Sequence, residues 1–320
     1  MITLIPWIGG KGKLIPTLQN MLPDDFIRFV DVFGGGGTVT FNLALPRNTQ
    51  RIYNDLNADL ANLMRVVKAA PLDFMDQLRF LPPHSRDEFN VLCDYLNTEE
   101  FTDEYLQKEL DLADRYFDPP DAEIIKNLLR KNSKENPVVR AAAFYKVMRG
   151  SFSGTGDSYG ARALNVRNFF YQIQRASDAL QYVIVENRTY EEIVLQNDHR
   201  AALFYFDPPY YTTEKYYAAS FGLADHYRLN ELIKGLKGYC ILSYNNCEFI
   251  RDLYKDFYIF LVKRQDSLSQ KEGQMYEELI ITNYDPREYV SQMSLLEQDS
   301  ENCILINEPQ TTIYLRRNAA

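Results

Sequence analysis

The residues best suited to chemistry in this chain lie at positions 203–210, which read Leu-Phe-Tyr-Phe-Asp-Pro-Pro-Tyr. Four apolar or aromatic residues in a row are typical of a buried parallel strand, and the two prolines end it. The sequence therefore predicts that Asp207 and the carbonyl group of Pro208 lie on a stiff turn after the strand. The carboxyl ends of strands are where open α/β sheets bind their ligands.

These groups suit a reaction at the exocyclic amine of a nucleobase. Such an amine is a poor nucleophile because its lone pair is delocalised into the ring. The ionised carboxylate of Asp207 and the carbonyl group of Pro208 only accept hydrogen bonds. Together they would hold both N–H bonds of the amine and favour a tetrahedral nitrogen with a free lone pair. The ring of Tyr210 would stack on a base that has left the duplex.

The alternative is a strand that simply ends at prolines. The same Asp-Pro-Pro sequence occurs within residues 117–121, but without an apolar run before it or an aromatic residue after it. We interpret that copy as an acidic loop. The copy at Asp207 therefore needs support from other parts of the chain.

A second candidate feature is a run of glycines after an apolar strand at residues 29–33. The residues that follow are Gly34, Gly35, Gly36, Gly37 and Thr38, and a helical pattern continues to position 45. A strand, a glycine turn and a helix form the first unit of a nucleotide-binding α/β fold. Val39 stands where a dinucleotide-binding motif has its third glycine, which argues against hydride transfer with a nicotinamide cofactor.

Asp55 follows the next short strand, at residues 51–53. It lies about 20 residues after the glycine turn, which is the spacing of an acid that binds the ribose hydroxyls of a nucleotide. The alternative is a helix N-cap, because Asn-Asp before a helix is a good capping sequence.

Composition and charge limit the class of protein. With 320 residues, of which 46% are hydrophobic and 25% charged, the chain has the composition of a globular protein with a large core. It contains no secretory start and no apolar run of about 18 residues, so we expect no export and no membrane span. Four cysteines without a Cys-x-x-Cys pair and three histidines predict reduced thiols in the cytoplasm and no zinc site.

Charge is distributed unevenly along the chain, whose net charge is −9. Residues 72–123 contain 15 acids against four lysines and arginines, whereas residues 126–167 contain nine basic residues against two acids. The basic segment is either a solvated helix face or a surface that contacts DNA phosphates. It includes a glycine- and serine-rich stretch at residues 150–157, which we interpret as a substrate-contacting loop.

The elements that must position these residues fall into two groups. Residues 57–142 have largely helical patterns, and about 150 residues between Asp55 and Asp207 are too many for a simple crossover. We therefore infer an inserted, mostly helical subdomain. Seven strand patterns surround it, at residues 29–33, 51–53, 182–185, 203–206, 239–244, 257–262 and 278–283, with a further candidate at 304–306.

Together these pieces resemble the Dam-type (D12 class, alpha-group) DNA adenine-N6 methyltransferases, which use S-adenosylmethionine. The resemblance rests on Trp-x-Gly-Gly-Lys at residues 7–11, the glycine loop, Asn54-Asp55 and residues 207–210, in the family's order. Weaker similarity covers Phe221, Asp225-His226 and residues 241–246 and 277–283. It implies a Rossmann-like methyltransferase fold with a mixed, mostly parallel seven-stranded sheet. Residues 1–58 and 169–320 would form this catalytic domain, and residues 59–168 an inserted, mostly helical target-recognition domain.

The resemblance implies site-specific methyl transfer to N6 of a flipped adenine in double-stranded DNA, with S-adenosylhomocysteine as product and no metal. Asp207 and Pro208 would bind N6, Pro209 would complete the turn, and Tyr210 would stack on the base. Lys11 would lie near the methionine carboxylate and Asp55 at the ribose. The implied cofactor-binding residues are Trp7, Gly9, Lys11, Phe33, Gly34, Gly35, Gly36, Thr38, Asp55 and Asp207.

In the insert, Phe152-Ser153-Gly154 resembles the family's aromatic-Asn-Gly hairpin that wedges into DNA. Serine replaces the asparagine, and Asp157 stands near a position where the palindrome-reading members carry arginine, so the familiar four-base site is not implied. The DNA contacts that we predict are Arg149, Phe152, Ser153, Arg162 and Arg167.

Other functions remain open at this point. They are a methyltransferase that acts on RNA or on a protein glutamine, and a DNA-binding relative without activity. For the main interpretation we expect a monomer that acts in the cytoplasm of a bacterium or on phage DNA, with a restriction endonuclease as a candidate partner. Residues 284–320 carry no motif that we can assign.

Overall fold

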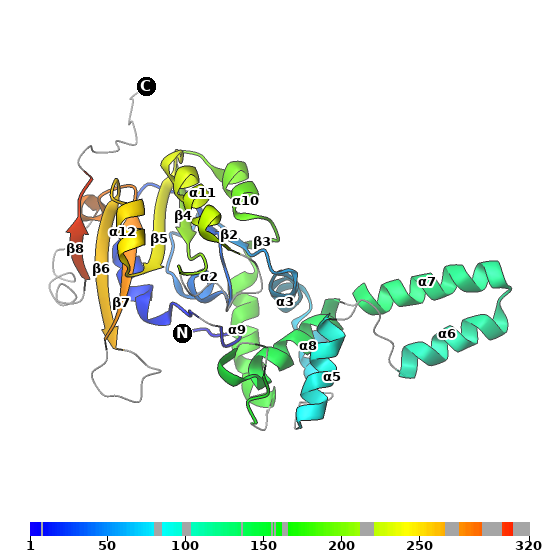
Figure 1. Cartoon of the computed structure of the whole chain (residues 1–320). Helices are drawn as coiled ribbons and strands as arrows, with labels where there is room; N and C mark the ends of the chain where they lie inside the picture. Colours follow the sequence, from blue (N-terminus) through cyan, green and yellow to red (C-terminus); the bar gives the residue numbers. More distant parts are fainter. Residues whose placement is uncertain are drawn as a thin grey trace. The chain divides into compact units, whose positions relative to one another are not determined.

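The computed structural model describes residues 1–7, 9–79, 85–97, 104–135, 137–154, 156, 158–161, 166–211, 221–265, 275–289 and 303–309. The chain divides into two compact units (Figure 1). The first consists of Met1–Ile2, Gly10–Ala61 and Tyr182–Ala320, and the second of Thr3–Gly9 and Asn62–Gln181. The insert predicted at residues 59–168 thus lies mainly in the second unit, which also contains the following helix, α9 (Phe170–Leu180).

The first unit is built on one sheet, whose strand order is β3-β2-β1-β4-β5-β7-β6-β8. Its eight strands, among the residues described, are β1 (Arg28–Asp31), β2 (Gln50–Asn54), β3 (Val183–Glu186), β4 (Ala202–Phe206), β5 (Tyr239–Asn245), β6 (Tyr258–Gln265), β7 (Met275–Thr282) and β8 (Cys303–Asn307). Strands β1 to β5 pair in parallel. Strand β7 runs antiparallel between β5 and β6, and β8 pairs antiparallel with β6.

The expected α/β fold with a mixed, mostly parallel sheet is confirmed, but the strand count of seven was one too low. The eighth strand, β8, follows the weak candidate at residues 304–306. Its residues alternate between partly buried and exposed positions along the outer edge of β6. A short, half-exposed strand has a weak hydrophobic pattern in the sequence. It forms by pairing with the edge of β6, which the local pattern does not reveal.

Helices cover both faces of the sheet, as in a doubly wound fold (Figure 1). One face carries α10 (Tyr190–Asn197), α11 (Leu223–Lys234) and α12 (Glu248–Leu253). The opposite face carries η1 (Gly12–Leu14), α1 (Ile15–Asn20) and α2 (Thr38–Asn42).

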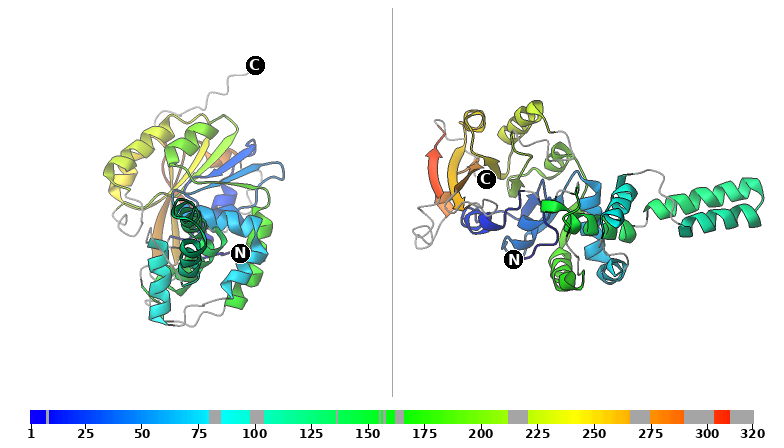
Figure 2. Two further views of the ribbon diagram at one scale, coloured as in Figure 1. Left: turned by 90° about the vertical axis from the view of Figure 1, so that its right-hand side faces the viewer. Right: turned by 60° about the horizontal axis from the view of Figure 1, so that its bottom comes forward.

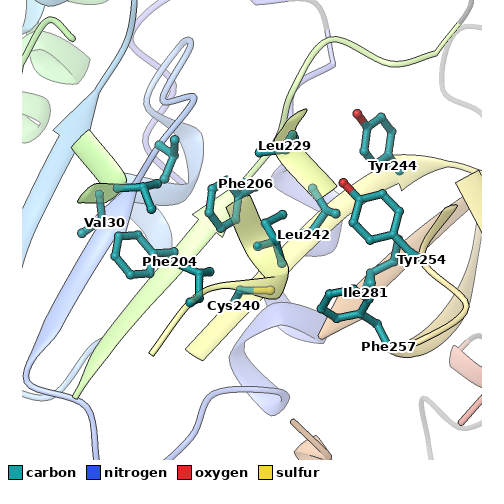
Figure 3. Close-up of a cluster of buried hydrophobic side chains, with 14 of the residues drawn as sticks. Val30, Phe204, Phe206, Leu229, Cys240, Leu242, Tyr244, Tyr254, Phe257 and Ile281 are labelled. Atoms are coloured by element: carbon teal, nitrogen blue, oxygen red, sulfur yellow. The ribbon is translucent and has the colours of Figure 1, made fainter. Parts of the chain in front are cut away.

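The central strands supply apolar side chains to both faces, because successive residues of a strand point in opposite directions. All five residues of β4 are buried. Phe204 and Phe206 pack in one core cluster with Leu229 of α11 (Figure 3), whereas Leu203 and Tyr205 pack in the other. The end of β4, where Asp207 begins, is therefore fixed from two sides.

The second unit is helical. Its remaining elements are α4 (Pro71–Leu78), α5 (Arg86–Asn97), α6 (Glu104–Tyr116), α7 (Pro119–Glu135), α8 (Pro137–Gly150), η2 (Phe152–Gly154) and η3 (Val166–Phe169), while α3 (Ala58–Ala69) begins in the first unit. Helix α8 is buried along most of its length, and Tyr145 on it packs against Phe74 and Phe169. Helices α6 and α7 lie side by side as a hairpin (Figures 1 and 2).

The second Asp-Pro-Pro sequence lies in this hairpin, and our interpretation of it as an acidic loop was wrong. Pro119 and Pro120 are the first two residues of α7, and the N–H group of Ala122 donates to the Asp118 carbonyl group at 2.8 Å. Proline suits the first turn of a helix, because the N–H that it lacks has no partner there.

Within the parts of the chain that the structure describes, no helix is both long enough and apolar enough to cross a membrane.

Candidate active site

Acidic residues from several strands meet at one edge of the sheet. Asp31 ends β1, Asp55 follows β2, and Asp207 follows β4, and these strands are parallel. Strand β7 runs the opposite way, and Glu278 in its middle lies at the same edge, opposite Asn245 at the end of β5. This edge is the ligand-binding edge of an open α/β sheet.

Asp207 is held on both sides of its carboxylate. Its Oδ2 lies 2.8 Å from Nζ of Lys11, and its Oδ1 accepts a hydrogen bond of 3.0 Å from Oγ of Ser243 on β5. Ser243 is itself 3.0 Å from the hydroxyl of Tyr205. Burial raises the pKa of Asp207 above its ordinary value, while the Lys11 ammonium opposes the rise and Glu278 adds to it. Lys11 therefore favours the ionised carboxylate that accepts hydrogen bonds.

Tyr210 is fixed by a second acid. Its hydroxyl donates to Oε1 of Glu278, which also lies 3.6 Å from Nζ of Lys11. The same ammonium lies 4.8 Å from the centroid of the Tyr210 ring. The ring of Tyr244 packs nearby, with 5.8 Å between the centroids, and Tyr210 is 7% exposed. Its stacking on a base stays a prediction.

The glycine loop is a tight backbone turn. Gly35 and Gly37 have φ angles of 50° and 76°, in the left-handed region that glycine adopts readily. A Cβ atom on Gly34 would lie 2.2 Å from the ring of Tyr53, whose hydroxyl donates to the carbonyl group of Gly35 at 2.8 Å. The loop thus needs glycine at 34 for lack of space and at 35 and 37 for conformation.

Asp55 braces this loop. Its Oδ2 accepts from the N–H group of Gly35, and its Oδ1 from that of Asn57, both at 2.8 Å. The N-cap that we considered for Asp55 belongs to Asn57, which accepts from the N–H groups of Asp59 and Leu60 at the start of α3. Burial raises the pKa of Asp55 to about 6. The ribose contact of Asp55 stays a prediction, while the alternative role as helix N-cap is filled by Asn57.

Asp31 belongs to this site and was missed in the sequence. It is 1% exposed, and the Thr40 hydroxyl donates to its Oδ2 at 2.6 Å. Its Oδ1 is buried and has no hydrogen-bond partner within the described residues. Burial, with a smaller contribution from Asp207 and Asp55, raises its pKa to about 7. The sequence feature that could have identified Asp31 is an acid at the end of the strand that leads into the glycine loop.

These residues fit S-adenosylmethionine. A buried carboxylate oxygen without a partner suits an ammonium group, and a loop that has no room for a side chain suits close approach of a ligand. Beside the loop, Phe33 stacks on Tyr190 with 5.7 Å between the ring centroids, and Phe221 meets Phe33 edge-on at 6.0 Å. Tyr190 is a further aromatic residue that the sequence patterns did not single out.

The remaining predicted cofactor residues are placed as follows. Gly36 completes the loop and Thr38 is the first residue of α2. Trp7 and Gly9 belong to the second compact unit, so their position at the cofactor stays a prediction. No cluster of side chains that could hold a metal ion occurs among the described residues.

Of the predicted DNA contacts, Arg149 is partly buried and bonds within the second unit. Its guanidinium donates to the carbonyl groups of Thr3 and Leu4, at 3.0 and 2.6 Å, and lies 4.2 Å from the ring centroid of Phe169. This geometry gives it a structural task, and its DNA contact stays a prediction.

The other predicted contacts lie on the loop after α8. Phe152 is 67% exposed on η2, and the neighbouring Gly154 has a φ angle of 71°. Arg162 lies outside the described residues, as do the side chains of Ser153 and Arg167.

The family model described as "D12 class N6 adenine-specific DNA methyltransferase" matches residues 7–268. A type II methyltransferase of Lactococcus lactis subsp. cremoris, M1.LlaDCHI, is 28% identical over 299 residues, which cover 87% of this chain and 94% of the relative. A DNA adenine methylase of Serratia marcescens is 26% identical, over 83% of this chain and 92% of the relative.

A viral relative is similar at lower identity. The type II methyltransferase M.CviBI of Paramecium bursaria Chlorella virus NC1A is 22% identical over 89% of this chain and all of the relative. The family match spans the glycine loop, the insert and the Asp-Pro-Pro-Tyr sequence, and the methyltransferases of this family use S-adenosylmethionine. The chain therefore belongs to the D12 class of N6 adenine-specific DNA methyltransferases.

Proposed function

We propose that the active edge of the sheet binds S-adenosylmethionine beside an adenine flipped out of double-stranded DNA. The observation that supports this best is the position of Asp207. Its carboxylate directly follows the buried strand β4, ahead of two prolines, and Lys11 and Ser243 hold it at the same edge as Asp31 and Asp55.

The cofactor would occupy the end of the sheet near the glycine loop. Asp55 would accept hydrogen bonds from the ribose hydroxyls, and the free oxygen of Asp31 would meet the ammonium group. Phe33 and the loop from Gly34 to Gly36 would surround the methionine portion. The ammonium group of Lys11 forms ion pairs with Asp207 and Glu278, so a contact with the methionine carboxylate would add to these two.

Bound S-adenosylmethionine supplies an electrophilic methyl group. The Asp207 carboxylate and the Pro208 carbonyl group would each accept one N–H of the adenine amine and direct its lone pair toward that methyl group. Pro209 would keep the turn stiff, and Tyr210 would contact the base. Such alignment of reactants is worth roughly 7–11 kcal/mol, so positioning would be the main contribution of these residues. The proposal requires no metal.

DNA is the substrate class of this family, and the bases contacted are part of our proposal. Phe152 is exposed and suits a wedge between base pairs, with Ser153, Arg162 and Arg167 beside it in sequence and Arg149 on the preceding helix. We further propose a monomer acting where its DNA is, in the cytoplasm of a bacterium or of a phage-infected cell. A restriction endonuclease would be its partner if the chain is part of a restriction–modification system.

The test uses Asp207→Ala and labelled S-adenosylmethionine with unmethylated genomic DNA. The wild-type protein should label adenines within one short sequence motif, which sequencing for N6-methyladenine would identify. The variant should transfer no measurable methyl group while it still binds S-adenosylhomocysteine by calorimetry. Turnover by the variant at the wild-type rate would refute the assignment of Asp207, and wild-type label found in RNA or protein instead of DNA would favour the alternative substrates.

A further inference from the structure

We infer that Glu278, on the antiparallel strand β7, is a positioning residue of the active site that acts through Tyr210 and Lys11. The inference rests on the proposed roles of Asp207 and Tyr210. It assigns a task to an acid that lies 71 positions after Asp207 in a segment with no catalytic motif.

The first observation is burial. Glu278 is 0% exposed, in a strand whose following residues are apolar. A fully buried carboxylate is costly unless charged or hydrogen-bonding groups compensate it. The role of Glu278 therefore depends on the groups that compensate its carboxylate.

The second observation is what Glu278 contacts. Its Oε1 accepts the hydrogen bond of the Tyr210 hydroxyl and lies 3.6 Å from Nζ of Lys11. Lys11 is only 3% exposed and lies 2.8 Å from Asp207, so its ammonium is shared between two carboxylates. Glu278 therefore touches two of the groups that surround the proposed nucleobase site.

The third observation is topology. Strand β7 runs antiparallel to β5, with Glu278 opposite Asn245 and Leu279 opposite Tyr244. The middle of β7, at Glu278, is thus fixed against the carboxyl end of β5. A side chain held on a strand in this way is placed more precisely than one on a loop.

Two consequences follow for the site. Glu278 fixes the hydroxyl of Tyr210 and with it the plane of the ring that would contact adenine. It also draws the Lys11 ammonium partly away from Asp207. Without the negative charge of Glu278, the Lys11 ammonium would interact more strongly with Asp207.

The second consequence predicts a pH effect. Among the described residues, the charged and titratable groups that face Asp207 are Lys11, Glu278, Asp31, Tyr205 and Tyr210. Among them Glu278 raises the pKa of Asp207 and Lys11 lowers it. If transfer needs ionised Asp207, removing the charge of Glu278 should move the acid side of the rate profile to lower pH.

The experiment measures kcat and KM for DNA as a function of pH for Glu278→Gln and Glu278→Ala. Glutamine removes the charge of Glu278, so we expect the acid limb to shift by about half a pH unit or more toward lower pH. Because glutamine still accepts the Tyr210 hydrogen bond, kcat should change only moderately. Alanine removes both the charge and the hydrogen bond to Tyr210, and kcat should fall by about tenfold or more. Binding of S-adenosylhomocysteine should stay near the wild-type level in both.

The matched control is Glu277→Gln on the same strand. Glu277 is 40% exposed, 3.7 Å from Nζ of Lys263, and accepts a hydrogen bond from Asn246. The Glu277→Gln variant loses one negative charge at the neighbouring position, and its pH profile should match that of the wild type. An equal shift in this control would mean a general charge effect and would overturn the inference.

The remaining outcomes are separable. If Asp207→Ala is inactive and Glu278→Gln has the wild-type acid limb, the inference about Glu278 fails alone, whereas an active Asp207→Ala refutes the proposed site. If both Glu278 variants fail to fold, Tyr210→Phe replaces them. Without the hydroxyl, Glu278 should hold Lys11 more strongly and the acid limb should move to higher pH, and an unchanged limb in that variant would overturn the inference.

Discussion

The ammonium group of Lys11 lies 2.8 Å from the carboxylate of Asp207, and only 3% of the lysine side chain is exposed. This ion pair, in which the Asp207 side chain is 19% exposed, joins a residue near the start of the chain to one that follows the helical insert in sequence. Removing one partner of such a pair leaves an uncompensated buried charge, which typically costs about 3–5 kcal/mol. The pair thus links the stability of the first unit to the charge state of its proposed catalytic acid.

Lys11→Met should move activity to higher pH. Lys11 opposes the rise in the pKa of Asp207 that burial causes, so its loss raises that pKa further. At neutral pH more of Asp207 would be protonated, and kcat should fall by about tenfold or more and recover partly as the pH rises. A pH profile of kcat checks this. Lys13→Met, an exposed lysine in the same helical turn, is the control, and equal profiles for both variants would contradict the prediction.

Gly34→Ala should disturb the glycine loop. The added Cβ would lie within 2.2–2.8 Å of three carbon atoms of the Tyr53 ring, and the Tyr53 hydroxyl bond to Gly35 keeps that ring in place. Overpacking of this kind costs about 1–3 kcal/mol. Urea unfolding should show the loss, and calorimetry a weaker affinity for S-adenosylhomocysteine. Gly235→Ala, where the nearest atom is 3.5 Å away and φ is not positive, should change neither, and a Gly34→Ala variant that behaves like the wild type would show that the loop has more room.

Asp31→Asn should stabilise the protein at high pH and weaken cofactor binding. The pKa of Asp31 is raised from 3.8 to about 7, so the folded state binds a proton that the unfolded state releases at lower pH. Its favourable contribution is full below pH 4 and is lost as the pH rises through 7, a difference on the order of 4 kcal/mol. The variant has no such loss, so its gain in Tm should be larger at pH 8 than at pH 5. Equal gains at both pH values would argue that Asp31 has an ordinary pKa.

Arg149→Met should lower both stability and the salt dependence of DNA binding. The variant loses the hydrogen bonds to the carbonyl groups of Thr3 and Leu4, and charged bonds of this kind contribute about 1.5–3 kcal/mol each. Urea unfolding and the salt dependence of DNA binding should be measured together. We expect a lower free energy of unfolding together with a salt slope lower by about one, from the loss of one phosphate contact, whereas an unchanged slope would leave Arg149 with its structural task alone.

The parts of the site that the sequence predicted are those with a local cause. A buried apolar run and two prolines define the end of β4, and close packing and positive φ angles require the glycines after β1. The two Asp-Pro-Pro sequences show the limit of such local patterns. At Asp207 the prolines end a strand, whereas at Asp118 they begin a helix, because the apolar residues after Pro120 recur at helical spacing.

Asp31 and Glu278 show what the sequence could not supply. Glu278 meets Tyr210 only because β7 lies beside β5 and runs antiparallel to it, a relationship between distant segments that no local pattern encodes. Asp31 was less remote, since it precedes the glycine loop directly, but its unpaired oxygen within the described residues follows from burial among Thr40, Asp55 and Asp207. The internal bonds of Arg149 to Thr3 and Leu4 were likewise beyond the sequence, because a basic segment does not reveal which of its members bond within the fold.

The position of β7 also decides how a shortened chain would behave. In the strand order, β7 alone connects β6 and β8 to the strands that precede them in sequence. A chain cut before residue 275 would leave the edge of β5, with Ile241 and Leu242, open to solvent. Open apolar edges pair with other chains, so nonsense variants in this region should be recovered as aggregates instead of as soluble, partly active fragments.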